Sequence, residues 1–249
     1  MSKQEPSSDY DSFAWFYERY WSREVPPQIL IVIDRLLVPH LPRGGRILDL
    51  CCGTGYTLAE LIRRGFEVTG IDRSREMLRY ARRTAPGAQL ILADASAFSL
   101  PPVYDGVIAT FDSLNHIMSL DKLTSAFHNV YRSLAPSGLF LFDMNMEKGF
   151  LLHWVDHFAI VEPEGVCVLK GNYDVEQRIG RYDITMFRQE GEMWRRTQTA
   201  ISERCYTAQE IRGALKQAGF KEISTYDAER DAGLAEHVGR TFFLVRKSR

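Results

Sequence analysis

The chain has 249 residues, of which 45% are hydrophobic, so it is long enough for one large domain with a full core, and disorder is excluded as its main state. Lys and Arg number 31 and Asp and Glu number 32, which argues against a polyanionic partner such as DNA or tRNA. We therefore expect a small or neutral partner and no nucleic acid.

The N-terminal part of the chain is first polar and then aromatic. Residues 1–12 (MSKQEPSSDYDS) hold no apolar signal core, and the longest aliphatic run, ILIVI at 29–33, stops at Asp34, far short of a membrane span. Residues 10–21 (YDSFAWFYERYW) place aromatic side chains near helical spacing, which is typical of a buried helix face. We expect a soluble, cytoplasmic protein with no membrane partner.

The four cysteines do not have the spacing of metal ligands. Cys51 and Cys52 are adjacent, an arrangement that makes a poor zinc chelate and a strained disulfide, while Cys167 and Cys205 each stand alone. We therefore expect reduced thiols and no metal site.

Residues 45–145 alternate strand and helix patterns. Near-continuous aliphatic runs predict five strands, at 46–50, 66–72, 88–94, 104–113 and 137–145. Helical spacing predicts the intervening helices at 57–64, 74–83 and 121–134. Repeated strand–helix units of this kind predict an α/β fold with a parallel, doubly wound, Rossmann-like sheet that is covered on both faces.

The pattern changes after residue 145. Period-two alternation at 167–176, 181–190 and 192–206 predicts an antiparallel meander, with turns at QRIG and EG. Thr207 and Glu210 form a capping box for a helix to about Gln217, which Gly219 ends. Two further strands are predicted at 220–227 and 241–247.

A parallel sheet of this type binds its ligand beyond the carboxyl ends of its strands. Polar and small residues gather at these ends, at 49–55, Asp72, Asp94, 111–116 and 143–145. Four of the five strands end in or near Asp. Each Asp alone is equally well explained as a turn or cap residue, but the set as a whole predicts a ligand site.

Two nucleotide-type ligands compete for this crevice. A dinucleotide requires G-x-G-x-x-G, yet Gly53 and Gly55 are followed by Leu58 where the third glycine should stand. Asp49, just ahead of the loop, would repel a phosphate. S-adenosylmethionine has no phosphate and carries an ammonium and a sulfonium, so the sequence favours this ligand.

The segment Asp49-Leu50-Cys51-Cys52-Gly53-Thr54-Gly55 resembles motif I (D-x-G-x-G-x-G) of the class I S-adenosylmethionine-dependent methyltransferases. Cys51 replaces the first glycine of the motif. We expect cysteine to fit at this position on the condition that its φ stays negative.

The resemblance extends along residues 45–145 and implies roles for residues after the second and third strands. Asp72 corresponds to the acid that accepts hydrogen bonds from both ribose hydroxyls, a task that suits an acceptor-only carboxylate. Asp94 and Ala95 correspond to the pair that meets adenine. Arg73 and Met77 would cover the ring, although a Met at helical spacing is equally well explained as core.

The segment FDSLNH (111–116) resembles the one that lies beneath the methionyl group and faces the acceptor in this family. Phe111 is therefore expected to contact the cofactor, and His116 to act as general base for a hydroxyl acceptor, or else to lie on the surface. The aromatic stretch at 10–21 resembles the lid helix of small-molecule members, from which Tyr17 would reach the methionyl group or the acceptor.

The resemblance divides the chain into an N-terminal helical lid (1–40), an S-adenosylmethionine-binding core (41–145), an inserted meander (146–206) and a C-terminal helix and hairpin (207–249) that complete a seven-strand sheet. The meander is expected either to cap the site and select the substrate or to serve stability or a homodimer. The motif order and the meander resemble sugar-amine N-methyltransferases.

We expect a methyltransferase that acts by in-line transfer on a nitrogen or oxygen of a small-molecule acceptor. Two alternatives remain. One is an NAD-dependent oxidoreductase, which Asp49 and Leu58 disfavour, and the other is a protein that binds S-adenosylmethionine without turnover.

Overall fold

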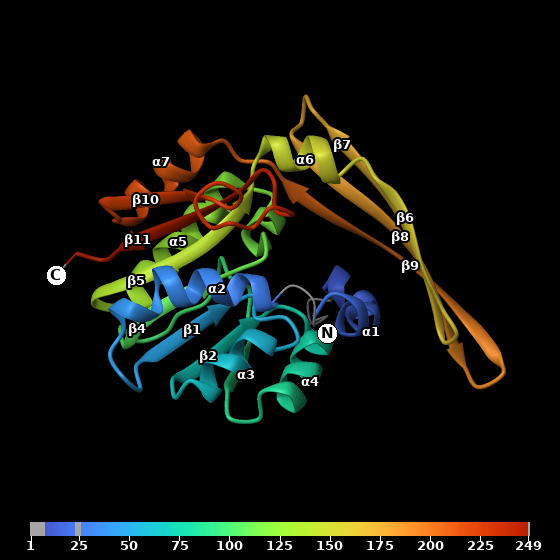
Figure 1. The fold of residues 1–249 in the computed structure, drawn as a ribbon, viewed down its shortest axis with the longest axis horizontal. Coiled ribbons are helices and arrows are strands. Elements are labelled where there is room, and N and C mark those ends of the chain that lie inside the picture. Colours follow the sequence, from blue (N-terminus) through green and yellow to red (C-terminus); the bar gives the residue numbers. More distant parts are fainter. Residues whose placement is uncertain (1–7, 23–25, 249) are drawn as a thin grey trace, which may run out of the picture.

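The computed structural model describes residues 8–22 and 26–248, which form one large sheet, one smaller sheet and the helices around them (Figure 1). The large sheet has seven strands in the order β10-β11-β5-β4-β1-β2-β3. Its strands are β1 (Arg46–Leu50), β2 (Glu67–Asp72), β3 (Gln89–Leu92), β4 (Tyr104–Ala109), β5 (Leu134–Asn145), β10 (Glu222–Asp227) and β11 (Arg240–Arg246). β1 to β5 pair in parallel, whereas β11 runs antiparallel to both of its neighbours. The predicted doubly wound, seven-strand α/β fold is confirmed.

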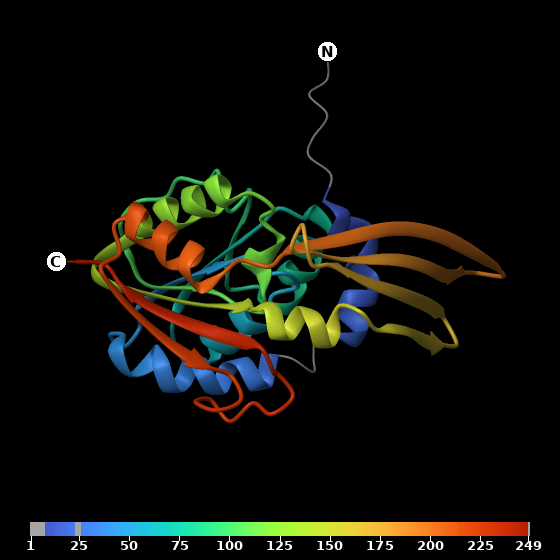
Figure 2. The ribbon, with the colours of Figure 1, turned by 90° about the horizontal axis from the view of Figure 1, so that it is seen from above.

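Helices cover both faces of this sheet (Figure 2). One face is packed by α2 (Pro26–Leu36), α3 (Tyr56–Arg63) and α4 (Arg75–Thr84), and the other by α5 (Leu120–Ser133) and α7 (Ala208–Ala218). The strands are apolar on both sides for this reason. None of the helices that the structure describes is both long enough and apolar enough to cross a membrane.

Local signals in the sequence set the helix ends. The Ser74 hydroxyl accepts a hydrogen bond from the Met77 amide at 3.1 Å and caps α4. The capping box of Thr207 and Glu210 opens α7, and Gly219 ends it with a φ of 112°. These caps form within a few residues of chain, which is why the sequence alone predicts them.

The smaller sheet is an antiparallel meander that extends away from the body of the molecule (Figures 1 and 2). It has four strands in chain order, β6 (His157–Glu162), β7 (Gly165–Asp174), β8 (Ile179–Glu190) and β9 (Met193–Arg204). The three strands predicted by alternation correspond to β7, β8 and β9. β6 was not predicted, because nearly all of its side chains are exposed and it therefore shows no alternation. The short helix α6 (Glu147–His153) joins the two sheets.

The predicted N-terminal lid contains two helices that pack differently. α1 (Asp9–Tyr20) buries Phe13 and Phe16 against the smaller sheet, while α2 places Ile29 and Ile33 in the core of the large sheet. Only α1 therefore lies over the crevice. Residues 1–7 and 23–25 of the predicted lid lie outside the described residues.

The segment after β4 differs from its prediction. The strand expected to reach residue 113 ends at Ala109, and Phe111 and Asp112 then adopt positive φ values of 66° and 48°. A 3-10 turn, η2 (Ser113–His116), follows, and another, η1 (Val38–His40), precedes β1. A left-handed pair of residues cannot continue a strand, so the chain turns across the carboxyl edge of the sheet at this point.

The centre of the large sheet is a stack of aromatic rings. Phe142 is fully buried, with ring centroids 4.7 Å from Phe140 and 4.9 Å from Phe243. We expect Phe142→Ala to lower the free energy of unfolding by about 3–5 kcal/mol, since it removes a buried ring and leaves a cavity. Val161→Ala, at a side chain that is 72% exposed, should change it by less than about 0.5 kcal/mol. Urea denaturation measures both, and similar effects of the two substitutions would contradict the assignment of this core.

Candidate active site

A cavity of about 710 Å³ lies where the carboxyl ends of β1, β2, β4 and β5 meet α1 and the smaller sheet. A second hollow of about 60 Å³ adjoins it and shares Tyr17, Cys51, Gly53, Phe111 and Ser113 with it. Every residue that the sequence singled out as a site residue lines one or both of these spaces: Tyr17, Asp49, Cys51, Gly53, Gly55, Asp72, Arg73, Met77, Asp94, Ala95, Phe111 and His116.

The loop between β1 and α3 bends sharply at three positions. Cys51, Gly53 and Gly55 have φ values of 65°, 54° and 85°. The prediction that Cys51 keeps a negative φ is therefore wrong: it adopts the left-handed conformation that favours glycine. A Cβ on Gly55 would lie 3.0 Å from the Ala81 Cα, so only glycine allows this approach of the loop to α4.

Two buried carboxyl groups lie beside this loop. Asp72, at the end of β2, accepts hydrogen bonds from the Gly53 amide at 2.9 Å and from the Ser74 amide at 2.8 Å. Burial raises the pKa of Asp72, against the effect of these two donors. Asp49 is 2% exposed and borders the smaller hollow, and burial followed by the nearby charge of Asp72 raises its pKa well above the ordinary value.

The residues after β3 form the next part of the cavity wall. Asp94 accepts hydrogen bonds from the Ser96 amide at 2.7 Å and from its hydroxyl at 2.6 Å. Burial opposes ionisation of Asp94, but these hydrogen bonds outweigh it and lower the pKa. Ala95 and the buried Met77 add apolar surface, and the half-exposed Arg73 lies near the Asp9 carboxylate, with their charged atoms 3.7 Å apart.

Hydrogen bonds join α1 to the amino end of α4. The Asp11 carboxylate accepts hydrogen bonds from the Ser74 hydroxyl at 2.6 Å, the Glu76 amide at 3.2 Å and the Ser8 amide at 3.0 Å. On its other side α1 packs Phe13 against the smaller sheet. This helix therefore bridges the two sheets above the cavity.

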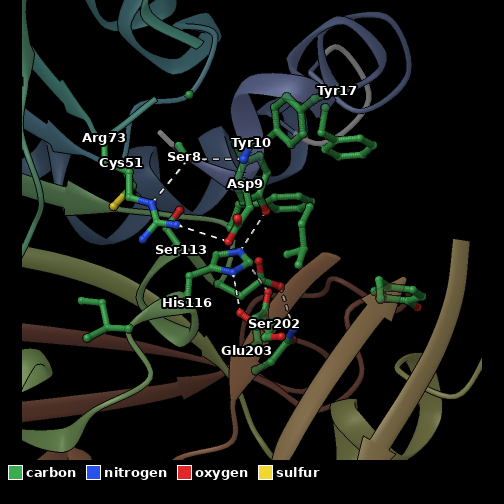
Figure 3. A pocket seen from close by; sticks show the side chains of 18 of the residues that line it. Ser8, Asp9, Tyr10, Tyr17, Cys51, Arg73, Ser113, His116, Ser202 and Glu203 are labelled. Carbon is green, nitrogen blue, oxygen red and sulfur yellow. Dashed lines mark hydrogen bonds and ion pairs between the residues drawn. The ribbon is translucent and has the colours of Figure 1, made fainter. Parts of the chain in front are cut away.

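His116 lies inside the cavity wall, with a side chain that is 22% exposed (Figure 3). Its Nε2 lies 2.9 Å from the Tyr10 hydroxyl and 3.3 Å from the Glu203 carboxylate, and its Nδ1 lies 3.0 Å from the Ser202 carbonyl oxygen. The carbonyl requires a proton on Nδ1 of the neutral ring, which leaves the lone pair on Nε2. Burial lowers the pKa of His116, so the neutral form is favoured.

A buried ionic cluster holds the segment that carries His116. Asp143, at 0% exposure, accepts hydrogen bonds from the Phe111 and Asp112 amides at 2.7 and 2.8 Å and pairs with Arg240. Arg240 also pairs with the Asp112 carboxylate at 2.7 Å. Burial opposes the charge of Arg240, but these two carboxylates raise its pKa. Within residues 8–22 and 26–248, no group of three His, Cys, Asp or Glu side chains is arranged to hold a metal.

Sequence reasoning missed three residues of the site. Tyr10 belongs to the aromatic stretch in which only Tyr17 was singled out, and Arg240 stands at the start of a strand with no local sign of its partners. Glu203 lies two residues after Ile201, so both side chains lie on the buried face of β9. A charged residue at a position where the strand pattern calls for an apolar one was the signal that could have revealed it.

Comparisons with known proteins bear on the identity of this site. A model of the methyltransferase domain family matches residues 47–138, which include the β1–α3 loop, Asp72, Asp94 and the segment after β4. The comparisons support a class I S-adenosylmethionine-dependent methyltransferase. S-Adenosylmethionine is its cofactor, and these findings favour a methyltransferase over an NAD-dependent oxidoreductase and over a non-catalytic binding protein.

Similar proteins span nearly the whole length of this methyltransferase. A putative methyltransferase of Bacillus subtilis (strain 168) is 29% identical over 96% of this chain and 98% of its own. A dTDP-4-amino-2,3,4,6-tetradeoxy-D-glucose N,N-dimethyltransferase of Saccharopolyspora spinosa is 26% identical over 90% of this chain and 89% of its own. The crystal structure of an S-adenosylmethionine-dependent methyltransferase from Clostridium acetobutylicum ATCC 824 has a TM-score of 0.80, at 22% identity over 97% of this chain and all of the other. This last likeness shows the shared fold.

The attachment of α1 to α4 depends on the charge of Asp11. Burial raises the pKa of Asp11, but hydrogen bonds from Ser74, Ser8 and Glu76 outweigh it and lower the pKa, so the attachment is present above about pH 4 and is lost as the pH falls through the lowered value. We expect Asp11→Ala to lower the free energy of local unfolding of α1 by about 1 kcal/mol. Amide hydrogen exchange at residues 9–20 should then be about fivefold faster. The exposed Ser12→Ala is the control. Equal exchange in both variants would contradict the role of Asp11.

Proposed function

We propose that this methyltransferase transfers a methyl group to a nitrogen or oxygen atom of a small-molecule acceptor by in-line displacement. One observation carries the proposal. A single cavity beneath α1 holds the acids Asp72 and Asp94 on one side and the neutral imidazole of His116 on the other. A cofactor and an acceptor bound in these two parts would face each other.

The donor set of the cavity fits S-adenosylmethionine. Each carboxylate oxygen of Asp72 accepts one backbone hydrogen bond and retains capacity for a ribose hydroxyl. Asp94 would accept the adenine amino group, and Met77 and Ala95 would contact the ring, with Arg73 at its edge. A Cβ on Gly53 would meet only the Tyr17 ring, at 3.9 Å, so the loop leaves room for a ligand.

The smaller hollow suits the methionyl end of the cofactor. It is bordered by Asp49, Cys51, Gly55, Tyr17 and Phe111, which combine a buried acid with two aromatic rings. A cation beside Asp49 would restore the ionised carboxylate that burial disfavours, while aromatic faces attract cations. A phosphate at the same place would be repelled.

The cofactor, when bound, supplies a methyl group on a positively charged sulfur, which needs no further activation. The protein therefore contributes position and proton control. His116, unprotonated on Nε2, would take the proton from the acceptor once the Tyr10 hydroxyl, which donates to Nε2 in this structure, has turned away. The Ser202 carbonyl, which accepts from Nδ1, would keep the ring oriented. Tyr17 would remain a neutral phenol, since burial raises its pKa, and would line the path between the cofactor and the acceptor. α1 would exclude water.

The smaller sheet supports a role in acceptor selection. Leu169 of β7, Ile184 of β8 and Ile201 of β9 line the cavity opposite the cofactor side. The enclosed space fits a small molecule better than a nucleic acid. The S. spinosa relative is by name an N,N-dimethyltransferase of a sugar amine, which favours nitrogen as the accepting atom here. Homodimer formation through this sheet remains a prediction.

Cofactor binding tests the first part of the proposal. We expect S-adenosylmethionine and S-adenosylhomocysteine to bind with micromolar affinity and Asp72→Ala to weaken both at least about tenfold, because hydrogen bonds to a charged group are lost. Calorimetric titration measures this, and the exposed Asp183→Ala is the control for charge loss. Binding of NAD instead, or an unchanged affinity in the Asp72 variant, would contradict the proposed site.

The base role of His116 has a separate test. We expect His116→Gln to lower kcat for methylation of a screened amine or hydroxyl acceptor by about 10²–10⁴-fold while S-adenosylhomocysteine affinity stays the same. In the unsubstituted enzyme, the pKa of His116 lies below the usual value of about 6.5, so the ring is still mostly unprotonated at pH 6.5. As the pH is lowered, we therefore expect activity to fall only below pH 6.5. His128→Gln, on the exposed side of α5, is the control. An unchanged kcat in the His116 variant would show that another group acts as base.

A further inference from the structure

The cavity contains more acidic than basic side chains among the described residues that line it. Besides His116, His153 and His237, its basic residues are Arg73, Lys122 and Arg240, and its acidic residues are Asp9, Asp72, Asp94, Asp112, Glu203 and Glu236. A surplus of carboxylates lowers the free energy of a bound cation and raises that of a bound anion. The distribution of the three basic groups decides whether any of them is available to an acceptor.

Each of these basic groups already lies near a carboxylate. Arg73 faces Asp9, and the charge of Lys122 contributes to lowering the pKa of Asp94, so both lie on the side that we assign to the cofactor. On the acceptor side, both terminal nitrogens of Arg240 are engaged by Asp112 and Asp143, and its buried Nε alone has no hydrogen-bond partner among the described residues. Within the described part of the wall, no arginine or lysine on that side is therefore without a carboxylate partner.

Glu203 is the acid in this cluster that has no full counterion. It is 3% exposed, and its Oε2 has no hydrogen-bond partner among the described residues. Its Oε1 lies 3.3 Å from Nε2 of His116, a ring that is neutral in the conformation described above. Asp112, Asp143 and Glu203 thus share the single positive charge of Arg240. Glu203 lines the cavity, and its unpartnered oxygen is buried in the wall. A small movement of the side chain would let this oxygen receive a hydrogen-bond donor from a ligand.

The remainder of the acceptor side is apolar and aromatic. Leu169, Ile184 and Ile201 from the smaller sheet face the cavity together with Phe13 of α1 and Tyr182 of β8. Such walls bind aliphatic or aromatic groups and exclude the water that a phosphate would require.

We propose that the acceptor is a primary or secondary amine on an apolar body without phosphate groups, which binds as its ammonium form to Glu203 with the body against the smaller sheet. The ammonium gives one proton to Nε2 of His116 before its nitrogen attacks the methyl group, and the methylated nitrogen then carries the positive charge that leaves the sulfur. This inference rests on the proposed methyltransferase function and specifies the substrate of that site. It separates this protein from its relatives whose names specify dTDP-linked sugars, because the described acceptor side offers no free arginine or lysine for a diphosphate.

The charge of Glu203 responds to such a ligand. Burial and then the charge of Asp112 raise the pKa of Glu203 well above its usual range, which disfavours its charged form while no cation is bound. An ammonium at its free oxygen would lower that pKa and release the proton to solvent. The groups that face this carboxyl are Asp112 and His116 after β4, Asp143 and Asn145 of β5, Arg240 of β11 and Tyr10 of α1.

Calorimetric titration of the protein saturated with S-adenosylhomocysteine tests the proposal with three probes. These are 2-phenylethylamine, its uncharged counterpart 2-phenylethanol and thymidine 5′-diphosphate. We expect the amine to bind at least about tenfold more tightly than the alcohol, which corresponds to about 1.4 kcal/mol, and the diphosphate not to bind. Amine binding should release protons, measured as a dependence of the heat on the ionisation enthalpy of the buffer.

Two variants assign the effect to Glu203. Glu203→Gln should remove the preference for the amine over the alcohol and leave S-adenosylhomocysteine affinity unchanged. Glu192→Gln, an exposed acid in the turn after β8, should keep the full preference. If the Glu203 variant does not fold, the comparison of the three probes on the unsubstituted protein still tests whether the site prefers an amine.

The outcomes separate this proposal from the one on which it rests. Equal affinity for amine and alcohol, no amine binding, diphosphate binding as tight as that of the amine, or an unchanged preference in Glu203→Gln would each overturn the amine proposal. Absence of S-adenosylhomocysteine binding would overturn the cofactor site alone, because the same three probes can be titrated into the protein without it.

Discussion

The pairing of Asp143 with Arg240 is the interaction on which the site depends. A carboxylate at zero exposure is costly unless it is paired and hydrogen-bonded, and Asp143 is satisfied by Arg240 and by the amides of Phe111 and Asp112. Those amides belong to residues with positive φ, so the same hydrogen bonds hold the chain in its turn across the edge of the sheet. The turn places His116 in the cavity wall. Breaking this pair would therefore release the segment that carries His116 as well as leave a buried charge.

The cavity exists because α1 joins the smaller sheet to the unit of the large sheet. The large sheet has its own core on each face, and the smaller sheet packs Cys167, Leu169 and Ile184 against Phe13 and Phe16. Asp11 then joins α1 to the amino end of α4. One helix thus fixes the position of the acceptor wall relative to the cofactor side. In the function that we propose, the edge of the large sheet binds the cofactor and the smaller sheet above it recognises the acceptor.

The electrostatics of the cavity follow from burial. Removing carboxyl groups from water raises the pKa of Asp49, Asp72 and Glu203, and each is then stabilised in its charged form by a ligand that brings donors or positive charge. The same burial lowers the pKa of His116 and leaves it neutral. Buried acids that favour cations and a neutral imidazole are consistent with the methyl transfer from a sulfonium to an amine that we propose. A cofactor that carries phosphate would meet repulsion at the same groups.

The sequence by itself determined the parts of this protein that depend on neighbours along the chain. Strand and helix patterns, the caps of α4 and α7, and the positions of Gly53, Asp72 and Asp94 at strand ends follow from local periodicity and spacing. Tertiary structure decided the rest. The positive φ of Cys51 is imposed by the packing of its loop, and β6 forms through backbone pairing without a buried face. The contacts of His116 with Tyr10, 106 residues earlier, and with Glu203 of β9 exist only because the smaller sheet and α1 close over the large one, an arrangement that no local pattern encodes.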